Sequence, residues 1–166
     1  MNAISASVTI GAPPERVYEI LLDLSARPAF TDHFMSELHL QRILPGVGAS
    51  ARFQTGPRRN RIWMETVLTE ADAPTRIAER GRGGRLDRIP IFTDWELRQV
   101  AGPRTEVTVS FRTEPGLRSD RMMEMGSRLW YRRRWGRALS RLRDIVESQA
   151  APERIQIAGG NRVPTT

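Results

Sequence analysis

The sequence contains neither cysteine nor lysine, and only two histidines occur among its 166 residues. Without cysteine the chain has no disulfide framework, no thiolate nucleophile and no cysteine-based metal site. His33 and His39 have no further partner at a spacing that suits zinc, so we expect no metal. The GRGG segment at 81–84 lies between two predicted strands and not before a helix, so it is no phosphate loop. We therefore expect no cofactor.

Long apolar runs are also missing. No segment approaches the ~20 apolar residues that a helix needs to span a bilayer. The opening MNAISASVTIGAPPE lacks the basic segment and apolar centre of a secretion signal. We expect a soluble, cytoplasmic protein without a transmembrane segment. Its length suits one domain, placed at residues 1–149, followed by a loosely held tail at 150–166 in which Pro and Gly occur without periodicity.

The chain is basic, with a formal charge of +7, and its 26 basic residues are all arginine. A basic surface favours anionic partners. The exclusive use of arginine is more simply explained by a coding preference, because phosphate-binding surfaces use both basic residues. Nucleic-acid binding is therefore our least favoured hypothesis, and the charge does not indicate whether the protein is a monomer or a dimer.

Hydrophobic periodicity predicts the order of elements. Residues 4–10 alternate as in a half-buried strand, and the prolines at 13–14 suit the start of a helix with apolar residues at helical spacing. A short helix or turn follows at 27–35. Six strands are then predicted at about 36–44, 49–55, 61–70, 75–82, 90–100 and 105–113, separated by Gly- and Pro-rich turns. A long helix at 119–148 closes the domain, which predicts an α+β fold in which an antiparallel sheet wraps that helix.

The long helix carries two apolar stripes. The later stripe, which includes Tyr131, Trp135 and Leu142, lies opposite most of the arginines, so we expect it to pack on the sheet while the arginines face solvent. Binding to nucleic acid, a membrane or another partner remains open for the arginine face. The earlier stripe, with Met122, Met125, Gly126, Leu129 and Trp130, lies nearly half a turn away. Either the helix kinks near 129–135 or its first half meets another environment, such as a methionine-lined ligand mouth or an irregular core.

Four stretches together resemble a known group, the SRPBCC or START-like helix-grip superfamily, specifically the polyketide cyclase/dehydrase and lipid-transport proteins. They are VTIGAPPERVYEILLDLSARPAF, RIWMETV, DWELRQVAGPRTEVTVSF and RRRWGRALSRLRDIVE. The resemblance covers about residues 5–148. It implies a curved seven-stranded sheet gripping the last helix around a deep apolar cavity that holds a hydrophobic small molecule.

Candidate ligand contacts follow from this resemblance. We expect the cavity to be bordered by aromatic side chains, although such residues are also ordinary core. They are Phe30, Phe34, Phe53, Trp63, Trp95 and Phe111, with Met122, Met125 and Leu129 from the helix. If Trp63 points inward, strand alternation places Glu65 and Thr69 on the same face. Arg80 and Arg82 of the next strand are then placed to hold a carbonyl or enolate oxygen.

Catalysis is the second hypothesis. Glu65, as a cavity carboxylate with a raised pKa, and Arg82 would be its catalytic residues; outward-facing strand charges are the alternative. The aromatase/cyclase branch has a tyrosine where this chain has Phe34 and an arginine where it has Thr69. Both exchanges remove a proton donor or an oxyanion partner. The sequence therefore favours a carrier, sequestering protein or cyclisation guide for a polyketide-like or lipid-like ligand over an aromatase/cyclase.

Overall fold

A single seven-stranded antiparallel sheet organises the molecule, and its strand order is β1-β7-β6-β5-β4-β3-β2. The computed structural model describes residues 3–42, 44–58, 60–148 and 154–155, without the side chains of 119–120 and 123–126. The strands are β1 (Ile4–Ile10), β2 (Met35–Arg42), β3 (Ser50–Thr55), β4 (Ile62–Asp72), β5 (Arg76–Gly83), β6 (Ile89–Gln99) and β7 (Thr105–Thr113). The helices are α1 (Pro14–Leu22), α2 (Pro28–Thr31) and α3 (Arg118–Glu147), with short turns η1 (Leu24–Ala26) and η2 (Arg85–Asp87).

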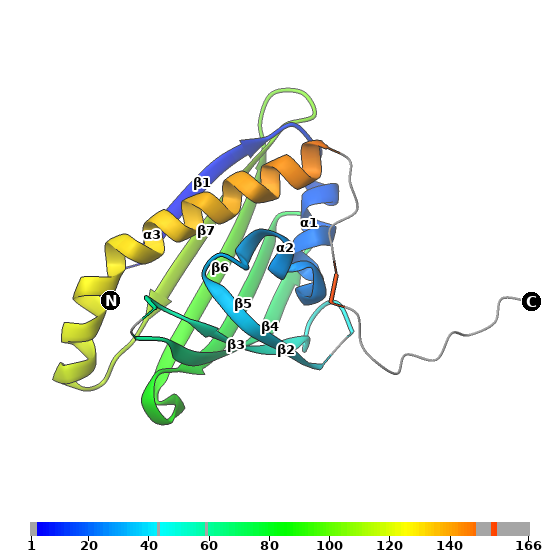
Figure 1. Ribbon diagram of the computed structural model, residues 1–166. Helices are drawn as coiled ribbons and strands as arrows, with labels where there is room; N and C mark the ends of the chain where they lie inside the picture. Colours follow the sequence, from blue (N-terminus) through cyan, green and yellow to red (C-terminus); the bar gives the residue numbers. More distant parts are fainter. Residues whose placement is uncertain (1–2, 43, 59, 149–153, 156–166) are drawn as a thin grey trace, which may run out of the picture.

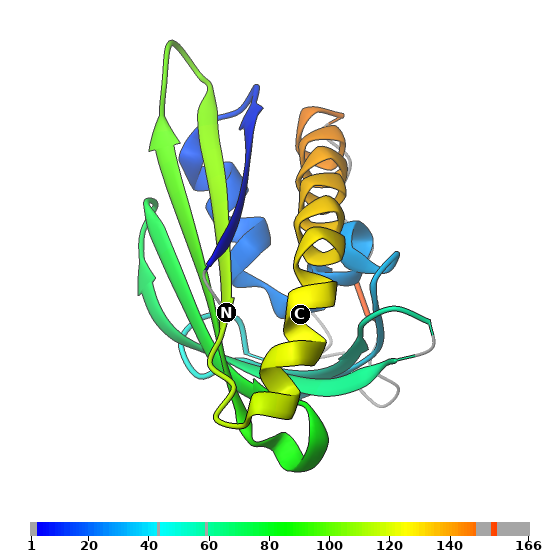
Figure 2. The ribbon, with the colours of Figure 1, turned by 90° about the vertical axis from the view of Figure 1, so that its left-hand side faces the viewer.

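The sheet curves around α3, which crosses its inner face, while α1 and α2 cover the sheet beside the later half of that helix (Figure 1, Figure 2). This is the helix-grip fold that the sequence predicts. Each predicted strand and the long helix is present, with ends shifted by one or two residues. Strands β2 to β7 form the expected meander, and β1 closes the sheet by pairing with β7.

Local chemistry sets the element ends. Helix α1 follows Pro13, whose backbone is extended, and begins at Pro14, where a missing amide hydrogen costs nothing. After α1, the Asp23 carboxylate accepts a hydrogen bond from the Ser25 amide at 2.9 Å and starts the short turn η1. At the far end of α3, the Glu147 carboxylate accepts from the Gly11 amide at 2.8 Å. This bond ties the end of α3 to the end of β1.

The later stripe of α3 packs on the sheet, as predicted. Tyr131, Trp135 and Leu142 are all buried. The Trp135 ring lies 5.5 Å from the Trp95 ring and 6.2 Å from the Phe111 ring, between centroids. These rings fill the space between the sheet and the middle of α3. The deep chamber implied by the resemblance is therefore packed with side chains at this level.

The inner face of β4 carries Met64, Thr66 and Leu68, which are buried. Trp63 lies on the outer face, where the Arg52 guanidinium sits 5.2 Å from its ring centre. The expectation that Trp63 points inward is therefore wrong. The flanking cation and His39, whose ring lies 6.2 Å from that of Trp63, cover the indole outside the core.

Most of the expected tail, 150–166, lies outside the described residues. Within it, the Arg154 guanidinium lies 3.0 Å from the Asp23 carboxylate, and the Ile155 amide donates to the Ser25 carbonyl at 3.2 Å. No helix in the described part of the chain is long and apolar enough to cross a membrane.

Candidate functional site

A pocket lies beneath the first half of α3, at the end of the sheet where β4 and β6 begin and β5 and β7 end. Its walls are apolar side chains of neighbouring strands, Ile62 and Met64 from β4 and Ile89 and Ile91 from β6. Tyr131 of α3 closes the inner end. Because β5 contributes glycine between these strands, the walls leave space that the same fold fills elsewhere with aromatic rings.

Glycines create part of this space. Gly83 faces Met64 across the β4–β5 pair, and a Cβ there would lie 2.7 Å from Met64 Cγ and 2.9 Å from Ile91 Cδ1. Gly84 has φ +78°, a left-handed conformation that side chains rarely adopt, and a Cβ there would lie 2.7 Å from Ile89. A side chain at either position would occupy the pocket or displace its wall.

A few polar residues also line the pocket. Asn60 and Arg85 line it from the β3–β4 connection and from η2, Ser127 lines it from α3, and Thr113, which is buried, lines it from β7. Arg85 is exposed, so its guanidinium is positioned at the entrance and not within the apolar part. An apolar interior with a few polar groups at the mouth suits a hydrophobic ligand that carries an oxygen function at one end.

The pocket is partly open, and its free volume is about 70 Å³. A cavity of about 150 Å³ holds benzene. The pocket as it stands therefore admits a small group or a chain end. A larger ligand requires movement of its walls, and the unbranched Met64 side chain is the wall residue best able to change shape.

A buried ion pair lies in the core behind the pocket. Glu79 of β5 and Arg27, between η1 and α2, are both buried, and the Arg27 Nη2 donates to Glu79 Oε1 at 2.6 Å. Glu79 also accepts from Trp95 Nε1 at 2.7 Å and from the Thr66 hydroxyl at 2.9 Å. These donors occupy both carboxylate oxygens, so the group serves to hold the α1–α2 segment on the sheet. The sequence analysis missed this cluster. A signal for it was present, because Glu79 lies two positions from the apolar Ile77 and therefore on the same face of the strand.

The contact between α2 and α3 carries a second polar cluster. His33 Nε2 lies 3.2 Å from the Arg134 carbonyl, and the Arg141 guanidinium hydrogen-bonds Asp32. Burial lowers the pKa of His33 below its usual value, and the Arg141 and Arg137 charges lower it further. The Arg141 hydrogen bond lowers the pKa of Asp32. The imidazole is therefore neutral at pH 7 within a ring of guanidinium groups.

The structure separates the predicted ligand contacts. Five aromatic candidates are buried in the core, namely Phe30, Phe34, Phe53, Trp95 and Phe111. Four candidates lie outside that core, Trp63, Thr69 and Arg80 on or near the outer face and Leu129 on the solvent side of α3. Met122 is 77% exposed. The side chain of Met125 lies outside the described residues, and none of the other ten candidates is among the described residues that line the pocket.

The two candidate catalytic residues share the outer face of the sheet. Glu65 and Arg82 face each other across the β4–β5 pair, and Arg82 is exposed. Arg80 lies nearby, 3.0 Å from the Asp94 carboxylate. Trp63 points outward, and Glu65, two positions further along the same strand, lies on the same face. A catalytic role for Glu65 and Arg82 thus gains no support from the geometry of the pocket.

Comparison with known proteins agrees with this geometry. A family model described as polyketide cyclase / dehydrase and lipid transport matches residues 1–147. The chain belongs to this family. A comparison with curated proteins finds no match. Family membership supports a ligand-binding or cyclase role.

Solved structures share the fold at low sequence identity. A Thermus thermophilus protein has 16% identity and a TM-score of 0.70, with 90% of this chain and 99% of that chain covered. The Zhui aromatase/cyclase of a Streptomyces species has 17% identity, a TM-score of 0.67 and coverage of 96% and 99%. A START superfamily protein of Mycobacterium smegmatis has 12% identity, a TM-score of 0.62 and coverage of 89% and 99%. These likenesses show the helix-grip fold of the polyketide cyclase / dehydrase and lipid transport family.

Proposed function

We propose that the protein binds a hydrophobic small molecule, polyketide-like or lipid-like, in the pocket beneath the first half of α3. In this role it is a carrier, a sequestering protein or a cyclisation guide. The observation that supports this most is the pocket itself, with four apolar wall residues from β4 and β6, a gap at Gly83 and Gly84, and few polar side chains in its lining. The family has members whose ligands are of this kind.

The ligand enters with its apolar part between Met64 and Ile91 and leaves its oxygen function at the rim near Arg85. An arginine there forms charge-assisted hydrogen bonds with a carboxylate or an enolate oxygen. Once the walls have moved to admit a larger ligand, burying about 300 Å² of its apolar surface contributes about 7 kcal/mol before the cost of that movement, which corresponds to a dissociation constant on the order of 10 µM. Binding of this strength needs no specific chemistry.

Catalytic cyclisation is the less favoured function. A catalytic base requires a carboxylate that is free to take a proton. The buried carboxylate of Glu79 already accepts hydrogen bonds from Arg27, Trp95 and Thr66. Phe34 is buried in the core without a proton to give. Geometry at the pocket therefore favours binding over acid–base chemistry.

A pocket-filling variant tests the proposal. Isothermal titration with dodecanoic acid and with 2-naphthol measures saturable binding to the wild-type protein, and we expect one site. Ile91→Trp places an indole in the pocket and should reduce the affinity at least tenfold, about 1.4 kcal/mol. Val67→Trp is the matched control, because Val67 is also β-branched but lies on the outer face of β4.

The control also defines failure. Val67→Trp should bind both probes as the wild type does. Equal affinity of the Ile91→Trp and Val67→Trp proteins, both shown to be folded by circular dichroism, would exclude the pocket as the binding site. Absence of saturable binding by the wild type to any apolar aromatic or acyl probe would exclude the function.

A further inference from the structure

The two apolar stripes of α3 face opposite environments. Helix α3 runs without interruption from Arg118 to Glu147. On its inner side Ser127 and Tyr131 line the pocket. Met122 and Leu129 of the earlier stripe are 77% and 56% exposed, and because they are two helical turns apart they lie on the same, outward side. Met122 and Leu129 thus form an apolar row in solvent, directly behind the pocket.

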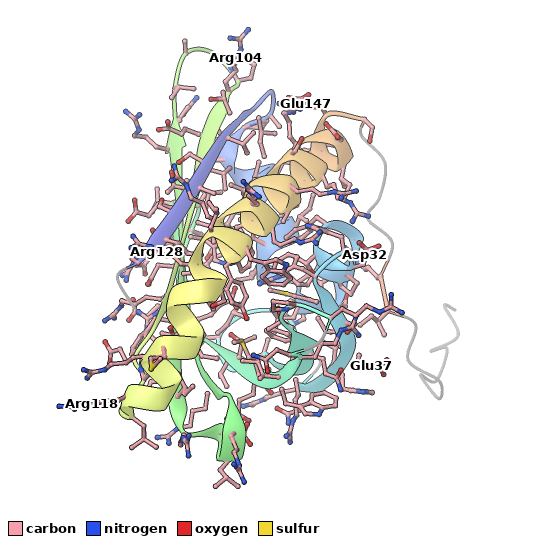
Figure 3. The ribbon with its side chains drawn as sticks, turned by 60° about the vertical axis from the view of Figure 1, so that its left-hand side comes forward. Asp32, Glu37, Arg104, Arg118, Arg128 and Glu147 are labelled. Atoms are coloured by element: carbon pink, nitrogen blue, oxygen red, sulfur yellow. The ribbon has the colours of Figure 1, made fainter. Side chains whose placement is uncertain are left out.

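Arginines flank this row on both sides. Arg128 and Arg132 share an open groove with Leu129 on the side of β1. Arg133 and Arg137 share a second open groove with Leu129 on the other side. Leu129 therefore stands between two pairs of guanidinium groups. We name this surface, made of Met122, Leu129, Arg128, Arg132, Arg133 and Arg137, the outer α3 face (Arg128 is labelled in Figure 3).

Within the part of the chain that the structure describes, these four arginines have no acidic partner. Among the described residues, none of Arg128, Arg132, Arg133 and Arg137 forms an ion pair or a side-chain hydrogen bond, and the sequence has no acidic residue between Glu124 and Asp144. Some exposed arginines of the sheet are paired, as in Arg98 with Glu106 at 2.6 Å. The outer α3 face is therefore an uncompensated positive surface with an apolar centre.

We propose that the outer α3 face docks on an anionic lipid surface. Large apolar side chains insert among lipid headgroups, while arginines bind the phosphates around them. Docking in this way brings the pocket, on the other side of the same helical turns, close to the lipid. The inference goes beyond ligand binding, since it assigns the protein a surface on which ligand transfer takes place.

A nucleic acid fits this face less well. Unpaired bases bind on exposed aromatic rings. The aromatic residue next to the row, Trp130, is only partly exposed, packs against Tyr131 with ring centres 4.8 Å apart, and is covered by the Arg134 guanidinium at 5.3 Å. The exposed residues of the row are aliphatic, which suits acyl chains and offers no stacking platform.

Vesicle flotation tests the docking. The protein is mixed with vesicles of pure phosphatidylcholine or of phosphatidylcholine with phosphatidylglycerol, at low and at high salt. We expect binding to the vesicles that contain phosphatidylglycerol, much weaker binding to the neutral ones, and loss of binding as salt screens the arginines. Arg132→Gln and Arg133→Gln should each weaken the partition about fivefold, and Leu129→Ser should weaken it by a similar factor.

Matched controls lie elsewhere on the molecule. Arg104→Gln removes an exposed arginine at the opposite end from Arg118 (Figure 3), and Leu44→Ser removes a leucine that is 72% exposed. Both should partition as the wild type does. Ile91→Trp should also leave partition unchanged, so that a failure of ligand binding and a failure of docking are separate results.

Three results would overturn the inference. The first is the absence of binding to vesicles containing phosphatidylglycerol. The second is an equal loss of vesicle binding in the control variants and in the variants of the outer α3 face. The third is salt-sensitive binding of a single-stranded oligonucleotide or of polyglutamate that requires Arg132 and Arg133 when vesicles do not bind, which would assign the face to a nucleic acid or to an acidic protein.

Discussion

Arg27 and Glu79 form the buried ion pair of the core. Removing one partner should lower the free energy of unfolding and so measure what the pair contributes. In Arg27→Met, the Glu79 carboxylate loses a donor at 2.6 Å and keeps two neutral donors, the Trp95 indole and the Thr66 hydroxyl. Both side chains of the pair are at most 4% exposed, so water cannot replace the lost cation. Removing one partner of such a pair costs about 3–5 kcal/mol, a large part of a typical total stability of 5–15 kcal/mol.

Urea unfolding followed by far-ultraviolet circular dichroism measures this cost. We expect Arg27→Met to lower the free energy of unfolding by about 3–5 kcal/mol, and the double variant Arg27→Met/Glu79→Leu to recover most of it because no charge is left buried. Arg98→Met, which breaks an exposed pair, should cost less than about 1 kcal/mol. If Arg27→Met and Arg98→Met cost the same, the pair does not hold the α1–α2 segment.

Two further predictions concern charged groups outside the pocket. The lowered pKa of His33 means that the unfolded chain takes up a proton first, so the free energy of unfolding should fall as the pH drops below the usual histidine value of 6.5. His33→Gln should flatten this slope in urea titrations at pH 7 and pH 5; an unchanged slope would contradict the placement of His33 among guanidinium groups. The loss due to Asp32 lies at lower pH, since its pKa is lowered from 3.8. Glu65→Gln and Arg82→Ala change side chains on the outer face of the sheet. Each should leave the affinity for dodecanoic acid unchanged and lower the free energy of unfolding by less than about 1 kcal/mol. A tenfold loss of affinity would show that these side chains reach the ligand.

The sequence predicts the fold well because strand and helix periods are local. Turn residues separate the six later strands, and the stripe with Tyr131 and Trp135 gives the face of α3 that packs on the sheet. Which face of β4 points inward is not predicted correctly. Apolar side chains occur on both of its faces, Trp63 and Val67 on one and Met64 and Leu68 on the other. The alternation of apolar residues alone does not show which of two such faces packs on the core.

The site is predicted less well because its parts come from distant segments. Arg27 meets Glu79 across 52 positions of sequence, and no local pattern joins them. The pocket forms where glycines of β5 leave a gap beneath α3, so its walls are aliphatic residues that sequence reasoning assigns to ordinary core. For α3, the two stripes were visible in the sequence, but only the position of the sheet shows that Met122 and Leu129 face outward.

The most direct test of the account is to locate a bound ligand by methyl-resolved NMR. The protein, labelled at isoleucine methyl groups, is titrated with dodecanoic acid. We predict saturable shifts at Ile62, Ile89 and Ile91, which line the pocket, and no shift at Ile10 and Ile77, which are fully buried in the packed core. Shifts at Ile10 and Ile77 with none at the pocket, or no saturable shift at any isoleucine, would contradict a hydrophobic ligand site beneath α3.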